Sequence, residues 1–313
     1  GGARRRALRT AVAPWRGAGR MAARPRAQGA AAGPVVNRRV SASSSSHAAS
    51  QLKQKPSIRK TIESMASTGS QAEYFKPDQT LIIFDWDDTL LPTTFLNNVA
   101  QAGGKGYQAL GGVRALALTR ALADHADLVR RVLVGAREVG HVAIVTSSVR
   151  PWVDRSAQQH LPGLDVPRLL RELGIPVLYA SGPCASSVEG LDMLEAHTER
   201  KRSVMAEFVG QVCRGGGALR SAVSVGDSPA EREALKRLAR HWEQPAGAAG
   251  RPSCKTVKLM SDPSLRQLGR QLQALAGWLD RVVSCDGDVD VSVGPREDLE
   301  TKLWTHFGPR PEK

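Results

Sequence analysis

The sequence predicts an α/β domain in which a doubly wound, mainly parallel sheet carries helices on both faces. Short apolar runs have the branched and aromatic content of buried strands, and they lie at residues 81–84, 141–148, 177–180 and 222–225. Segments with helical periodicity separate them. The polar positions Asp85, Thr146, Lys201 and Asp227 are 61, 55 and 26 residues apart. Such spacings fit strand–helix units laid side by side.

Composition divides the chain into three expected parts: a disordered basic tail over residues 1–75, a folded domain over residues 76–283 and a C-terminal extension over residues 284–313. Residues 1–60 hold 14 of the 44 Lys and Arg side chains and none of the 30 Asp and Glu. The charge of +14 therefore belongs to the tail, and the rest of the chain is neutral.

The tail is rich in Arg, Ala and Ser, which is typical of organellar transit peptides and cannot bury a core. If it is one, the protein belongs to a plastid or mitochondrion, and otherwise to the cytoplasm. Two other interpretations stay open: sequence upstream of a start at Met21, or a basic arm that binds nucleic acid. The arm is disfavoured because Trp15 is the only aromatic residue among the arginines. No run of 18 apolar residues predicts a membrane span.

The run at residues 81–84 ends in a cluster of carboxylates that includes Asp85 and Asp87. If strand geometry continued, the two side chains would share a face. Two carboxylates within about 4 Å repel each other by roughly 4 kcal/mol at an effective dielectric near 20, so such a pair indicates a shared proton or a divalent cation. The alternative is a helix N-terminus capped by the polar residues.

The pattern Asp85-x-Asp87-x-Thr89-Leu90 after an apolar strand resembles the first motif of the haloacid dehalogenase (HAD) superfamily, most of whose members are Mg²⁺-dependent phosphohydrolases. The resemblance spans about residues 79–260 and implies a small or absent cap domain. It implies that Asp85 is the nucleophile, that Asp87 is the acid and base, and that Mg²⁺ is held by Asp85, Asp227 and the main-chain carbonyl of Asp87.

Two helical patterns follow, at 113–121 and 128–136, and each is expected to bury one stripe. Gly140 is expected to end the second. The next strand, 141–148, ends in hydroxyls ahead of a helix start, an arrangement that suits a phosphate. The resemblance makes Thr146 the phosphate-binding residue, whereas ordinary helix caps would explain the hydroxyls equally well.

After the strand at 177–180, three cations stand side by side: Arg200, Lys201 and Arg202. The HAD resemblance implies that one of them neutralises the phosphate. Neighbouring helical residues point about 100° apart, so only one faces the site. Lys201 is in line with Val204, Met205, Phe208 and Val212, which favours it. The alternative is a solvated basic turn.

The run at 222–225 leads to Gly226 and Asp227. Gly226 allows close backbone approach, and the resemblance makes Asp227 the metal-binding acid of the fourth motif. Ser228 and Glu231 have the spacing of a capping box. The role of Glu231 stays open between a cap and a second acid near the metal.

The segment 255–259 is expected to be the last strand, at an edge, with its lysines pointing outward. An amphipathic helix over 265–279 closes the domain. The acidic segment 286–297 is rejected as a calcium loop because Val291 stands where that loop needs glycine.

The sequence thus predicts a Mg²⁺-dependent phosphohydrolase that acts on a phosphorylated small molecule or a phosphoprotein. The competing prediction is a HAD-like binding or scaffold module without catalysis, motivated by the bulky Trp86 between the two acids. A nucleic-acid partner is not favoured.

Overall fold

The computed structural model describes residues 76–102, 112–181, 192–214, 218–242 and 250–309. The tail expected over residues 1–75 lies outside them. No helix among the described residues has both the length and the apolar character needed to cross a bilayer.

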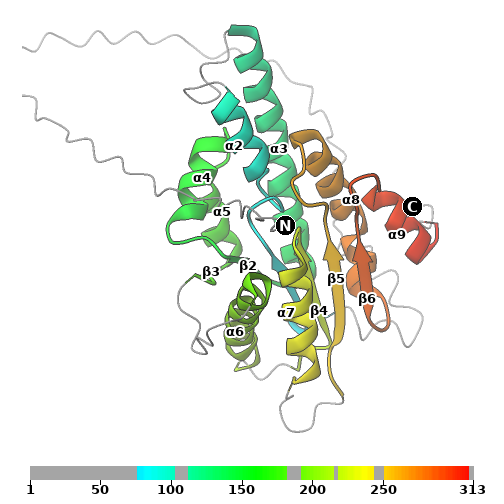
Figure 1. Ribbon diagram of the computed structural model, residues 1–313. Helices are drawn as coiled ribbons and strands as arrows, with labels where there is room; N and C mark the ends of the chain where they lie inside the picture. Colours follow the sequence, from blue (N-terminus) through cyan, green and yellow to red (C-terminus); the bar gives the residue numbers. More distant parts are fainter. Residues whose placement is uncertain (1–75, 103–111, 182–191, 215–217, 243–249, 310–313) are drawn as a thin grey trace, which may run out of the picture. The chain divides into compact units, whose positions relative to one another are not determined.

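A six-stranded sheet, parallel throughout, forms the centre of the fold (Figure 1). This confirms the predicted α/β class. The strand order is β3-β2-β1-β4-β5-β6. The bounds are Thr80–Phe84 for β1, His141–Thr146 for β2, Val177–Tyr179 for β3, Ser221–Gly226 for β4, Ser253–Lys258 for β5 and Val289–Ser292 for β6.

Helices cover both faces of the sheet, as predicted (Figure 1). Ile82 and Phe84 of β1 pack in a core with α3, α4, α5, α8 and α9, whereas Leu81 and Ile83 pack with α6 and α7 on the other face. The bounds are Pro77–Gln79 for the 3₁₀ helix η2, Thr93–Ala102 for α2, Gly112–Val139 for α3, Trp152–His160 for α4, Val166–Leu173 for α5, Met193–Cys213 for α6, Pro229–Arg240 for α7, Leu265–Ser284 for α8 and Leu299–Phe307 for α9.

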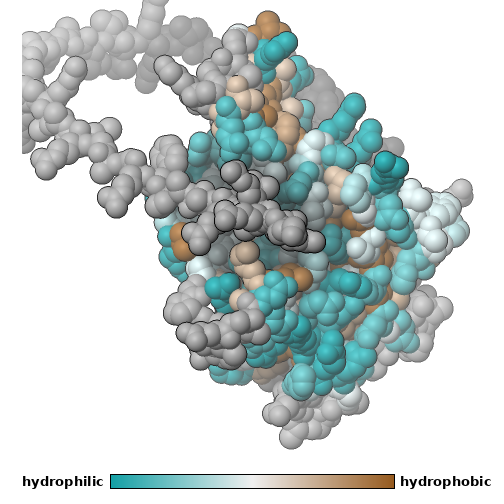
Figure 2. All heavy atoms as spheres, in the orientation of Figure 1, coloured by the Kyte–Doolittle hydropathy of each residue, from teal (hydrophilic) through white to brown (hydrophobic). Residues whose placement is uncertain are grey.

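The two helices expected between β1 and β2 are a single helix, α3. Its second half buries the expected stripe, but Val113 and Leu116 in its first turns are 83% and 71% exposed. The prediction that the stripe at 113–121 is buried is therefore wrong for these turns, because they extend past the carboxyl ends of the strands (Figure 1). Hydrophobic residues gather over this end of α3 at the top of Figure 2.

The prediction that the fifth strand lies at an edge is wrong, because β6 pairs with β5 in parallel. The residues after 283, expected as an extension, thus supply the sixth strand of the sheet and α9. The prediction that the lysines of β5 point outward fails at Lys255, which is fully buried. Its ammonium donates to Ser221 Oγ at 3.0 Å and to the carbonyl of Val283.

Burial lowers the pKa of Lys255 to about 8, despite the opposing charges of nearby acidic groups. Because the unfolded chain keeps a pKa near 10.4, it binds more protons than the folded chain between pH 8 and 10.4. Stability contributed at this site should therefore rise with pH across that window, by about 3 kcal/mol. Urea unfolding measures the free energy of unfolding of the wild type and of Lys255→Met. From pH 7 to 10.5 the wild-type value should rise relative to that of the variant. A difference independent of pH would contradict the assignment.

The strand order reverses between β1 and β4. From β1 the chain proceeds through β2 and β3 on one side, and from β4 through β5 and β6 on the other. In open α/β sheets, ligands bind in the crevice outside the carboxyl ends of the strands at such a point. Asp85 and Asp227 stand there, immediately after β1 and β4.

Candidate active site

The loop after β1 is folded around the main chain of Trp86. The Trp86 carbonyl accepts hydrogen bonds from the amides of Leu90 at 2.9 Å and Leu91 at 3.0 Å. Asp88 takes the left-handed conformation, with φ of 52°. The Trp86 indole is fully buried and donates to Ser156 Oγ in α4 at 3.0 Å. The Trp86 side chain therefore anchors the loop in the core.

His125 of α3 also holds this loop. Its Nε2 lies 2.8 Å from the carbonyl oxygen of Leu90. Because a carbonyl only accepts, this contact assigns the proton to Nε2. Burial lowers the pKa of His125, which favours the neutral ring. The loop that carries the acids is thus fixed by one indole and one imidazole.

The carboxylate of Asp87 lies among hydroxyl and indole donors. Oδ1 accepts from Thr93 Oγ1 at 2.7 Å and from Trp152 Nε1 at 2.8 Å. Oδ2 accepts from Ser148 Oγ at 2.9 Å and from Thr146 Oγ1 at 3.4 Å. These bonds bring together the end of β1, the end of β2 and the starts of α2 and α4. The structure thus places Thr146 beside Asp87. The sequence predicted that polar residues at the ends of these strands lie close together.

Asp85 faces a different partner. Its Oδ1 accepts from Lys201 Nζ at 2.7 Å, and both side chains are buried. Arg200 instead bonds the main chain of Ala196, and Arg202 bonds Glu199. Of the three neighbouring cations, Lys201 is the one whose side chain is buried, at 3% exposure, in line with the helical spacing.

Glu231 is the second carboxylate on Lys201, and the sequence left its role open. Its Oε1 accepts from Lys201 Nζ, while Oε2 accepts from the amide of Ser228 at 3.0 Å and completes the predicted capping box. Gly226 makes this possible, since a Cβ there would lie 2.5 Å from Cγ of Glu231. The glycine is thus required by the close approach of the Glu231 side chain.

Burial raises the pKa of Asp85 well above its ordinary value, with Glu231 and Asp227 adding to the effect and Lys201 opposing it. Burial also opposes the charge on Lys201, but Asp85 and Glu231 hold its pKa above the ordinary value. The attraction of Lys201 lowers the pKa of Glu231 against the effect of burial. The hydrogen bonds thus place the Lys201 ammonium between the carboxyl groups of Asp85 and Glu231.

Asp227 lies beside the β1 loop, where its Oδ1 accepts from Thr89 Oγ1 at 3.4 Å. Burial, followed by repulsion from Glu231 and Asp88, raises the pKa of Asp227 to about 7. Burial likewise raises the pKa of Asp88. The carboxyl groups of Asp85, Asp88, Asp227 and Glu231 thus interact with one another around Lys201, and a bound cation would relieve their repulsion.

In the described part of the chain, no three His, Cys, Asp or Glu side chains form a metal-ligating group by themselves. Oδ2 of Asp85 and the main-chain carbonyl of Asp87 accept no hydrogen bond there, and Oδ2 of Asp227 accepts none from another described residue. Mg²⁺ commonly takes one or two carboxylates and keeps several waters. Two carboxylates and one carbonyl fit that requirement.

The structure therefore brings two groups of predicted residues together: Asp87 with Thr146, and Asp85 with Lys201. Asp227 contacts Thr89 of the same β1 loop, and its charge acts on Asp85. Sequence reasoning missed Thr93 and Trp152 as partners of Asp87, because nothing in the local sequence points from the start of a helix to an acid on another strand.

No family model matches this chain, and no curated protein matches it either.

Proposed function

We propose that this protein is a Mg²⁺-dependent phosphohydrolase that cleaves a phosphate monoester through an aspartyl-phosphate on Asp85. The observation that carries the proposal is the buried contact of Lys201 with Asp85 and Glu231 at the reversal of strand order, beside Asp227. A carboxylate held next to an ammonium at such a crevice suits attack on an anionic group. The HAD-like order of motifs, from Asp85 to Asp227, supports the same chemistry.

In the proposed first step, a carboxylate oxygen of Asp85 bonds to phosphorus while the ester P–O bond breaks. Asp87 gives a proton to the leaving alkoxide, which departs as the alcohol. In the second step water attacks phosphorus and gives a proton to Asp87. Inorganic phosphate leaves, and the Asp85 carboxylate is restored.

Lys201 and Thr146 would bind the phosphoryl oxygens, the first by charge and the second by its hydroxyl. Mg²⁺, held by Asp85, Asp227 and the carbonyl of Asp87, would supply the positive charge that lets an anionic substrate approach these carboxylates. The Asp87 hydrogen bonds to Thr93 and Trp152 fix its carboxyl group in one orientation, as an acid and base requires.

Hydrolysis of p-nitrophenyl phosphate by the full chain should require Mg²⁺. We expect activity to fall to background in EDTA and to return on addition of excess Mg²⁺, because the acids around Lys201 would otherwise repel the phosphate. The absorbance of the released p-nitrophenolate measures the rate. Equal rates with and without EDTA would contradict the metal requirement.

One observation favours the second candidate, a HAD-like binding module without catalysis. Four hydrogen bonds to Asp87 engage its carboxylate and would compete with a leaving group. Vanadate binding separates the two candidates, because a phosphohydrolase should bind this phosphoryl mimic only with Mg²⁺, whereas an inert module has no reason to bind it.

A further inference from the structure

Among the described residues, β3 is the strand at one edge of the sheet and pairs only with β2. The Ile144 amide donates to the Pro176 carbonyl, and the Ala180 amide donates to the Thr146 carbonyl. Because bonding alternates along a parallel strand, the amides and carbonyls of Val177 and Tyr179 point away from β2. No hydrogen bond engages them within the described residues. This edge can therefore accept another extended chain.

A groove of about 640 Å³ runs along the same edge. Its floor includes Val177 and Tyr179, and its sides come from α5 on one face of the sheet and from α6 on the other, where Phe208 lines it. A groove that spans both layers at a strand edge has the form of a site for an extended peptide, whose main chain pairs with the edge while its side chains point alternately to the two faces.

The charge in this groove favours an acidic occupant. Arg150 and Arg171 both line it, and neither forms an ion pair within the described residues. Arg150 instead lies over the ring of Tyr179, 4.9 Å from its centroid. Asp154 is the acid among the lining residues. Two arginines without carboxylate partners suit bidentate contacts to carboxylates or phosphates.

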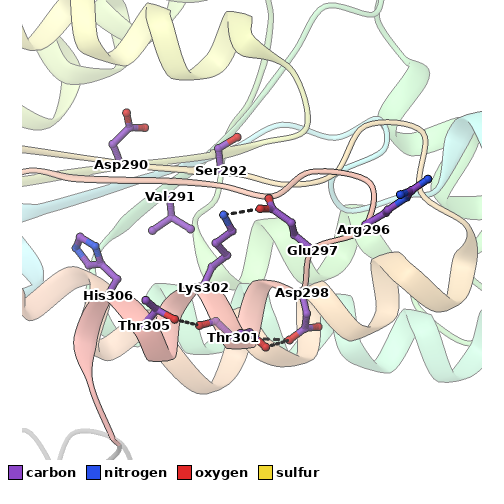
Figure 3. Close-up of a pocket in the computed structure, with 10 residues that line it drawn as sticks. All are labelled: Asp290, Val291, Ser292, Arg296, Glu297, Asp298, Thr301, Lys302, Thr305 and His306. Atoms are coloured by element: carbon purple, nitrogen blue, oxygen red, sulfur yellow. Dashed lines mark hydrogen bonds and ion pairs between the residues drawn. The ribbon is translucent and has the colours of Figure 1, made fainter.

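The opposite edge of the sheet differs in this respect. A pocket of about 690 Å³ lies between β6 and α9 (Figure 3). Two of its carboxylates are already paired: Glu297 contacts Lys302 at 2.7 Å, and Asp290 contacts Lys236 at 2.7 Å. The other two charged residues that line it, Arg296 and Asp298, have opposite signs. The β6 pocket thus lacks the pair of like charges without ion-pair partners that Arg150 and Arg171 give the β3 groove in the described part of the chain.

The β3 groove also leads to the candidate active site. Tyr179 is the register partner of Thr146, whose hydroxyl contacts Asp87. Arg150 follows Ser148, another partner of Asp87, by two residues. A chain lying along β3 would thus pass the carboxyl end of the sheet, where the phosphate is expected.

We propose that the β3 groove binds the substrate as an extended phosphorylated peptide, which adds a strand to β3 and places acidic side chains on Arg150 and Arg171. The substrate class would then be a phosphoprotein. This inference rests on the proposed function for the use of the phosphate, but peptide binding is measured independently of turnover.

The probe is a short fluorescein-labelled peptide of alternating valine and threonine, with glutamates at its amino end and a central non-hydrolysable phosphonate analogue of phosphoserine. Fluorescence anisotropy with the full chain and Mg²⁺ should give saturable binding. Arg171→Glu should weaken it by about tenfold or more, while Arg270→Glu, the same change at an exposed position of α8, should leave it unchanged. Hydrogen exchange should show new protection of the Val177 and Tyr179 amides.

A second peptide, N-methylated at alternate residues, cannot donate along one edge and should bind about tenfold more weakly. Equal binding of the two peptides, no effect of Arg171→Glu, or no binding by the wild type would overturn the inference. Hydrolysis of p-nitrophenyl phosphate without peptide binding leaves the phosphohydrolase standing and removes the docking site. Peptide binding without hydrolysis leaves the docking site standing and removes the phosphohydrolase.

Discussion

Asp85→Asn should abolish turnover of p-nitrophenyl phosphate, lowering kcat by about 10⁴-fold or more. The amide is a poor nucleophile, and it removes a negative charge that a divalent ion would use. Steady-state release of p-nitrophenol in Mg²⁺ measures the effect. The fold should persist, because Lys201 keeps its second carboxylate on Glu231.

The matched control is Asp127→Asn on the exposed face of α3, where the carboxylate lies 3.6 Å from Arg130. This variant should keep wild-type rates, because exposed ion pairs contribute little to stability and it lies outside the site. Activity of Asp85→Asn within tenfold of the control would rule out Asp85 as the nucleophile.

Lys201→Met should destabilise the fold by about 3–5 kcal/mol, because it leaves buried carboxylates on Asp85 and Glu231 without their common cation. Urea unfolding at pH 7 measures the free energy of unfolding. The double variant Lys201→Met/Glu231→Gln should recover part of the loss, since it removes one of the unpaired charges. Hydrolysis should be lost in both variants.

Arg200→Met is the control for this change, because Arg200 is only partly buried and bonds a main-chain carbonyl of its own helix. It should change stability by no more than about 0.5 kcal/mol. If Lys201→Met unfolds at the same urea concentration as Arg200→Met, the buried cluster does not have the energetic role assigned to it.

The central strands were predictable because a strand buried on both faces is rich in apolar residues without alternation, continuously so in β1 and with one serine inside the run in β4. The choice of Lys201 was predictable for a similar reason, since its spacing to Met205 and Phe208 is helical and all three are buried. Local periodicity reports on burial wherever the element lies against the core along its whole length.

The errors arose where burial depends on distant elements. The first turns of α3 have helical periodicity but extend past the sheet, so Val113 is exposed. The local sequence predicts that Lys255 points outward, but β6 and α8 enclose it. The sequence did not reveal β6, which has only four residues. No local pattern records which later segment will cover a strand.

The site shows the same division. The acids of β1 and β4 stand at strand ends that the sequence identifies. The contacts of Trp152 with Asp87 and of Glu231 with Lys201 depend on how helices meet across the sheet. The contact of Glu231 with the buried lysine could not be predicted, because a capping box alone explains the spacing of Glu231 from Ser228.

A crystal structure of the full chain grown with Mg²⁺ and beryllium fluoride would test the central claim most directly. We expect a trifluoroberyllate group bonded to a carboxylate oxygen of Asp85, with Lys201 and Thr146 on its fluorines and Mg²⁺ on Asp85 and Asp227. A crevice without either group, or a metal bound away from both aspartates, would contradict it.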